Sequence, residues 1–247
     1  MKFPPPQAWR RGRRLVRTIL TVFVTTFFLG ALLAILALWV ILRAIAYVPD
    51  FYRIGLSVPD SQLAPIYDKF VDRVSASVAQ LKKNKAIEAV LPEDELNAWL
   101  TIQGPRWWRG ETPVTIRSPR VRLGDKKIWL GAQVEMRWLK GVLWFAVEPE
   151  VRGPNVVAVR IEEARLGRVP IPTDRLARLV VSGYLTETVG PHRVTPYWEM
   201  GADGRPILVL HLDVTPDPNS PDRIQVDGFR VGEGAVAISL RIVRPPK

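Results

Sequence analysis

The chain has 247 residues, of which 47% are apolar, and it carries a formal net charge of +11 and no cysteine. The absence of cysteine excludes a disulfide framework, a thiol nucleophile and thiolate metal sites. Six of the eleven net charges precede residue 18, which leaves only +5 for the remaining 230 residues. The basic excess is therefore mainly an N-terminal tail, and we expect no nucleic-acid partner.

The first predicted element is a transmembrane helix. From Thr18 to Leu42 there are 25 consecutive residues without a charge, and a helix of that length spans about 37 Å, more than a hydrocarbon core of about 30 Å. Cations are far more numerous before this segment than after it, so the positive-inside rule predicts an N-terminus in the cytoplasm and a C-terminal domain outside the cytoplasmic (inner) membrane. The alternative is a cleaved signal peptide, favoured by Ala44 and Ala46, although its apolar region usually has only about 7 to 15 residues.

Two amphipathic helices are predicted after a juxtamembrane linker over residues 43–58. The first begins at Asp60 as the N-cap and ends near Lys83, because apolar residues recur at spacings of three and four. These residues are Leu63, Ile66, Phe70, Val74, Val78 and Leu81. A short alternating run at 86–91 then leads to a proline and three acids, which indicate the start of a second helix over 93–102.

From Val114 onward the apolar period is two, which is typical of antiparallel strands with one wet face. The apolar face of the first long strand consists of Ile128, Leu130, Ala132, Val134, Met136 and Trp138. Turns are predicted at Lys140–Gly141 and at Gly153–Asn155, so that three successive strands form a meander. The remaining predicted elements are a helix at 173–188 and strands at 207–214, 223–231 and 235–243.

Together these elements predict an α+β fold. A basic tail (1–17) and a transmembrane helix (18–42) precede an extracytoplasmic domain (59–247), in which a long, curved antiparallel sheet packs on two or three amphipathic helices. An antiparallel sheet with one apolar face needs a cover, and the predicted helices are the only elements that this reading leaves for it.

Three stretches in this order resemble a family of bacterial membrane proteins. They are the segment 91–100, which contains Glu95-Leu96-Asn97, the meander around 134–151, and the segment 164–172, in which Leu166-Gly167 precedes two prolines. Behind an N-terminal anchor, they are similar to single-pass proteins of the YpmS type. That family has no established activity, so the resemblance implies a location in the cell envelope and an α+β fold rather than a reaction.

Few residues are candidates for chemistry. His211 and Asp213 are two apart, so they share one face of a predicted strand and are candidates for a metal site or a base with its orienting acid. Two ligands are too few for a metal, however, and an ordinary solvent-facing pair explains them as well. Glu148 with Glu150, and Glu162 with Glu163, are paired carboxylates of the kind that glycoside hydrolases use only across a cleft. We expect no metal and no cofactor.

Two sets of residues are candidates for binding. The first is the segment Arg106–Arg109, in which Trp107 and Trp108 are flanked by arginines. It suits contact with a lipid interface or a flat ligand, unless a tryptophan simply plugs the sheet edge. The second is an apolar groove lined by strand residues: Ile128, Leu130, Val134, Met136, Trp138 and Phe145.

Three classes of function follow from these features. The first is a non-catalytic envelope module that binds a lipid or another apolar ligand, with the anchor and the basic tail in contact with membrane lipids. The second is an envelope scaffold that recruits a protein partner and binds no ligand. The third is an extracytoplasmic hydrolase that uses His211 and Asp213 or a carboxylate pair.

Overall fold

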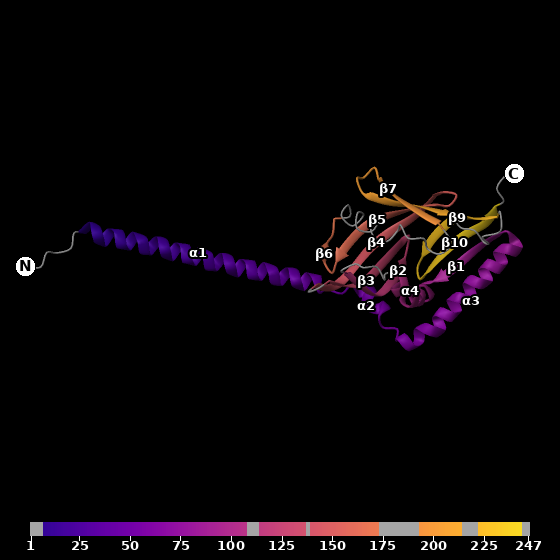
Figure 1. Ribbon diagram of the computed structural model, residues 1–247, viewed down its shortest axis with the longest axis horizontal. Coiled ribbons are helices and arrows are strands. Elements are labelled where there is room, and N and C mark those ends of the chain that lie inside the picture. The colour runs from indigo at the N-terminus through magenta and orange to yellow at the C-terminus, as the bar shows by residue number, and fades with distance from the viewer. Residues whose placement is uncertain (1–6, 108–113, 137–138, 173–192, 214–221, 244–247) are drawn as a thin grey trace, which may run out of the picture. The chain divides into compact units, whose positions relative to one another are not determined.

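The computed structural model describes residues 7–107, 114–136, 139–172, 193–213 and 222–243, and the fold is α+β, as predicted (Figure 1). The chain divides into two compact units, residues 1–44 and 45–247. The first unit is nearly all helix α1, which runs from Gln7 to Ile45. Within α1 the stretch Val22–Ile45 has a mean hydropathy of 2.5 and is not buried against protein. It is long and apolar enough to cross a membrane.

The second unit begins with three helices and a strand. Their bounds are α2 at Asp50–Gly55, α3 at Asp60–Asn84, β1 at Ala86–Pro92 and α4 at Glu93–Trp107. The helix predicted at 60–83 is confirmed, but its N-cap residue is Pro59 rather than Asp60. Helix α4 continues five residues beyond the predicted end at 102. Within the predicted linker, α2 packs on the sheet.

The predicted apolar stripe of α3 is buried only at its two ends. Leu63 and Leu81 are buried, whereas Val74 and Val78 are 37% and 38% exposed. Between these ends α3 packs against α4, where Phe70 lies 5.8 Å from Trp99 between ring centroids. The recurrence of apolar residues at spacings of three and four therefore predicted the helix correctly, but it did not predict how much of its apolar face is buried.

A seven-stranded antiparallel sheet forms the largest part of the domain. Its strands are β2 (Val114–Gly124), β3 (Lys127–Met136), β4 (Leu139–Gly153), β5 (Val156–Leu166), β6 (Val169–Pro170), β7 (Arg193–Met200) and β8 (Pro206–Asp213). Their order is β2-β3-β4-β5-β8-β7, and β6 pairs with β5. The predicted meander is thus confirmed. Its predicted turn at Gly153–Asn155 is also present, and Asn155 within it has φ 60°. The helix predicted at 173–188 lies outside the described residues.

The turn predicted at Lys140–Gly141 is wrong, because both residues belong to β4. The pairing of β3 with β4 extends to Met136 opposite Leu139, which places Lys140 opposite Glu135. The Lys140 Nζ and Glu135 Oε1 atoms are 2.6 Å apart, and such a cross-strand pair of opposite charges favours this register. Trp138 lies outside the described residues.

A second, three-stranded sheet has the order β1-β10-β9, with β9 at Arg223–Gly232 and β10 at Ala235–Val243. Together with α4 it covers the apolar face of β2 and β3. The shared cluster has Val121, Leu123 and Val236 at its centre. Leucines of α4 and apolar residues of β3, β9 and β10 pack around it: Leu96, Leu100, Ile128, Leu130, Phe229, Val231 and Ile238. Helices alone were expected to cover the sheet, so this part of the prediction is corrected.

Two asparagine side chains close the strand edges where the two sheets meet. Asn97 of α4 donates from Nδ2 to the Val121 carbonyl at 2.9 Å and accepts from the Val121 N–H at 2.7 Å. Asn155, in the turn between β4 and β5, makes the same two kinds of bond with β9, to the Ile224 carbonyl at 3.1 Å and from the Val226 N–H at 2.6 Å. An amide that donates and accepts replaces a missing strand neighbour, which prevents pairing of that edge with another chain.

We predict that Asn97→Asp destabilises the domain at neutral pH. The carboxylate keeps the shape of the amide but places an acceptor against the Val121 carbonyl, and losing this bond should lower the free energy of unfolding by about 2 kcal/mol. The folded state then favours the protonated acid and holds its pKa above the ordinary value of about 4, so the loss should shrink as the pH falls toward about 4 and be smallest below it.

Thermal unfolding of the full chain in detergent, followed by circular dichroism at both pH values, measures this. Asn84→Asp, at the exposed end of α3, is the matched control. An Asn97→Asp melting curve that matches that of the control would show that the amide does not hold this edge.

Candidate functional site

The predicted segment Arg106–Arg109 lies at the end of α4. The helix includes Arg106 and Trp107, so the segment begins as the last turn of a helix and not as a loop. Trp108 and Arg109 lie outside the described residues. The pairing of two tryptophans with two arginines therefore stays a prediction from the sequence.

The residues predicted to line an apolar groove share one face of the sheet, but several are packed into its core. Ile128 and Leu130 pack against two hydrophobic clusters, and Phe145 packs against one of them. Val134 is 4% exposed, whereas Met136 is 36% exposed at the end of β3. Toward β2 this face is occupied by α4 and the small sheet; among the described residues, no helix covers it toward β5, β8 and β7.

The strand register continues the same apolar face across four strands. Pro149 of β4 lies opposite Val159 of β5, which lies opposite Leu208 of β8, which in turn lies opposite Trp198 of β7. A parallel row two residues along consists of Val151, Val157, Leu210 and Pro196. Paired residues in an antiparallel sheet point to the same side. The two rows therefore form one apolar surface, here called the four-strand apolar face.

Trp198 is the unusual member of the four-strand apolar face. Its ring packs against the cluster of Val147, Ile161 and Ala164. Its Nε1 nitrogen is buried, and no described group accepts a hydrogen bond from it. A buried N–H without an acceptor costs about 1 to 3 kcal/mol. Strand β7 was not predicted, because Pro196 interrupts its pattern, although the apolar residues Val194, Trp198 and Met200 at even positions were a usable signal.

The opposite face of the same strands is hollow and charged. Arg152 of β4 reaches across β5 and β8, and its Nη1 lies 2.6 Å from Glu199 Oε2 of β7. Small and branched residues of β5 and β8 are buried there: Ala158, Ile207 and Val209. Two adjoining cavities of about 480 and 440 Å³ lie beside this bridge, and Arg152 and Arg160 line both of them. Their walls carry charges of both signs, which suits polar groups rather than a lipid chain.

Two of the residues considered for catalysis have partners other than each other: His211 stacks on an aromatic ring, and Glu162 is paired with a cation. The His211 ring stacks on Tyr197 at 5.4 Å between centroids. Burial, together with a hydrogen bond to Glu199, raises the pKa of the Tyr197 phenol. The Asp213 side chain lies outside the described set. Glu162 contacts Lys127 at 3.2 Å. Within the described ranges, no three His, Asp or Glu side chains are grouped as metal ligands would be.

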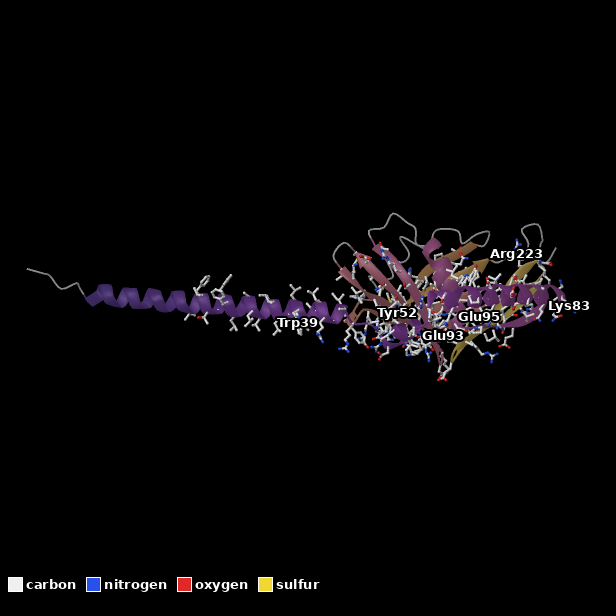
Figure 2. The ribbon with its side chains drawn as sticks, turned by 90° about the horizontal axis from the view of Figure 1, so that it is seen from below. Trp39, Tyr52, Lys83, Glu93, Glu95 and Arg223 are labelled. Carbon is white, nitrogen blue, oxygen red and sulfur yellow. The ribbon has the colours of Figure 1, made fainter. Side chains whose placement is uncertain are left out.

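The Glu95-Leu96-Asn97 element holds the domain together. Glu95 is 4% exposed, and its carboxylate accepts three hydrogen bonds from Arg73 of α3 at 2.8 to 3.1 Å. Asn97 closes the edge of β2, and Glu93 accepts from the Leu123 N–H at 2.6 Å. Glu93 and Glu95 lie in the part of the domain where α3, α4 and β2 meet (Figure 2). The motif that carries the family resemblance is thus structural.

Comparison of the chain with protein-family models, with curated proteins and with solved structures gives no match. The resemblance to proteins of the YpmS type therefore stays a prediction.

Helix α2 packs against the face of β2 and β3 that is opposite to the cluster around Val121 and Leu123. Tyr52 is 1% exposed, and its hydroxyl donates to the Ser118 carbonyl at 2.8 Å. A Cβ on Gly131 would lie 2.9 Å from the Tyr52 ring, so the absence of a side chain there makes room for the ring. The buried Arg120 donates from Nε to the Gly55 carbonyl at 2.8 Å. These contacts make the segment after the apolar helix an integral part of the domain.

We predict that Tyr52 gives the domain an alkaline stability limit. Burial raises the pKa of its phenol above the ordinary value of 10.0, so the unfolded chain loses this proton first as the pH rises. The stabilisation is complete below about pH 10 and declines above it. Tyr52→Phe should lose about 1 kcal/mol below pH 10, from the hydrogen bond to Ser118.

The difference in unfolding free energy between the wild type and Tyr52→Phe, measured from pH 8 to 11, should therefore narrow at the alkaline end. Two profiles that stay parallel over this range would show that the phenol remains solvated in the folded state.

Proposed function

We propose that this protein is a membrane-anchored, non-catalytic module of the cell envelope, with its domain outside the cytoplasm, and that the domain binds an apolar or amphiphilic ligand such as a lipid. Support for the anchor comes from the helix stretch Val22–Ile45, which has the length and hydropathy of a membrane span. Support for the orientation comes from the six cations that precede Thr18 without any acid.

The contacts of Ile45 favour an anchor that is retained. Cleavage after Ala46, between the small residues that suit a signal peptidase, would remove Ile45. That side chain packs on the domain, where a Cβ on Gly141 would lie 3.2 Å from Ile45 Cγ2. Loss of Ile45 would uncover this glycine and remove a contact within the domain.

The observation that carries ligand binding is the buried Nε1–H of Trp198 on the four-strand apolar face, for which no described residue supplies an acceptor. An amphiphile would supply both missing partners, because its chain would cover the partly buried Leu208 and Leu210 while an ester or phosphate oxygen would accept from the indole. The ligand surface proposed here lies next to the groove predicted from Ile128, Leu130, Val134, Met136, Trp138 and Phe145. It shares the same face of the sheet.

We predict that the full chain, purified from membranes in detergent, retains an amphiphile of defined mass in native mass spectrometry. Trp198→Phe keeps an aromatic ring but removes the N–H donor. Its occupancy should fall about fivefold, as expected for one hydrogen bond of about 1 kcal/mol. Tyr197→Phe, on the opposite face of β7, is the matched control and should retain the ligand as the wild type does.

A clean unliganded mass for the wild type, or equal occupancy in Trp198→Phe, would contradict ligand binding on this face. The second candidate, an envelope scaffold, would then lead. It is favoured by the position of β7 at the end of the described strand order, with Met200 70% exposed, because an uncovered terminal strand is a template for strand addition.

A further inference from the structure

Three residues at the start of the domain, Ile45, Tyr47 and Phe51, pack on the large sheet. Ile45 is both the last residue of the apolar stretch and a residue packed against Gly141 of β4. Tyr47 follows Ile45 by two residues, and the Arg168 guanidinium lies 4.1 Å from the centre of the Tyr47 ring. Phe51 then meets Trp144 at 6.0 Å between ring centroids. The chain from Ile45 to Phe51 is thus packed on the sheet.

Chain length limits how far this end can be from the membrane surface. Two residues span at most about 7 Å, and the headgroup region on each side of the hydrocarbon core is about 5 to 8 Å deep. If Ile45 ends the membrane span, Tyr47 and the guanidinium on its ring lie within or directly above the headgroups. The distance argument uses only the chain between Ile45 and Tyr47 and the packing of Tyr47 inside the domain.

The same end of the domain carries exposed cations. Lys140 and Arg168 are both exposed. Lys140 forms an ion pair with Glu135, whereas no described carboxylate pairs with Arg168. Strand β6, which begins one residue after Arg168, lies at the opposite end of the domain from the C-terminal end of α3 (Figure 1). A guanidinium that stacks on an aromatic ring and has no carboxylate partner among the described residues is well suited to a phosphate.

We propose that this end of the domain, formed by Tyr47, Lys140 and Arg168, docks on the headgroups of the bilayer that holds the apolar stretch, with Arg168 bound to an anionic lipid phosphate. The inference rests on the anchoring part of the proposed function and not on ligand binding. It goes beyond anchoring because it fixes which surface of the domain faces the membrane. The four-strand apolar face then keeps a defined orientation toward the bilayer.

Spin labels on the full chain test the docking, and the absence of native cysteine makes single labelling sites simple to introduce. One label is placed through Pro170→Cys, beside Arg168, and one through Lys83→Cys at the far end of the domain from Tyr52 (Figure 2). The protein is reconstituted into vesicles of phosphatidylcholine with phosphatidylglycerol and a nickel-chelating headgroup lipid. The label at position 170 should relax several-fold faster than the label at position 83.

The charge is tested by adding Arg168→Gln to the Pro170→Cys protein. Each basic group near an anionic surface contributes about fivefold to membrane contact. Arg168→Gln should therefore lower the docked population about fivefold in vesicles with phosphatidylglycerol and leave it unchanged in vesicles that contain only phosphatidylcholine and the nickel-chelating lipid. Arg168→Lys should retain most of the docking, and Lys82→Gln, far from this end, should have no effect.

Equal relaxation of the labels at 170 and 83 would overturn the docking. An effect of Arg168→Gln that is the same in both lipid mixtures would overturn the role of anionic phosphate. Flotation of the protein with the vesicles after alkaline extraction is scored separately. Failure to float would reject the anchor itself, whereas a floating protein with equal labels would reject only the docked orientation.

Discussion

Every backbone N–H and C=O at the edge of a buried strand needs a partner, and this requirement decides how the domain is assembled. Strand β2 is one terminal strand of the large sheet, and β9 is one terminal strand of the small sheet. Asn97 supplies a donor and an acceptor to the first edge, and Asn155 supplies them to the second. Asn155 also accepts from the Leu212 N–H at 2.9 Å through its own carbonyl. One turn residue therefore links β9 to β8 across the junction of the two sheets.

Local sequence signals predicted most of the described elements and few of their contacts. The period-two alternation of β3 and the Gly153–Asn155 turn are local, so the meander could be read directly from the residues. The cover of the sheet depends on β1 pairing with β10, which is about 150 residues away in the chain. The residues at 86–92 predict an extended segment, but no local pattern in them indicates that its partner strand is β10. The prediction of a turn at Lys140–Gly141 was wrong for a related reason. A lysine followed by a glycine is compatible with a turn, but here the lysine pairs with Glu135 and the glycine makes room for Ile45, which is distant in the sequence.

The candidate site shows the same division. The sequence correctly indicated that Ile128, Leu130 and Phe145 share an apolar face, but only the register across β5, β8 and β7 shows where that face continues. Trp198 escaped notice because a proline two residues earlier argues against a strand. The two faces of these strands have different chemistry. One carries apolar rows with a buried indole donor, and the other carries Arg152 bridged to Glu199 above small side chains. The proposed ligand surface is the first of these faces.

The segment that follows the apolar helix links the domain to its proposed membrane anchor. Ile45, Tyr47 and Phe51 pack on the sheet, so the segment that follows residue 44 belongs to the domain. The central claim is that the domain stands outside the cytoplasm on a retained anchor. The most direct measurement is labelling of the Lys83→Cys full chain in intact spheroplasts with a membrane-impermeant maleimide, followed by isolation of the membrane fraction. The account predicts a labelled protein that stays with the membrane and has the mass of the uncleaved chain. Labelling only after lysis, or a labelled protein released without its first 46 residues, would contradict it.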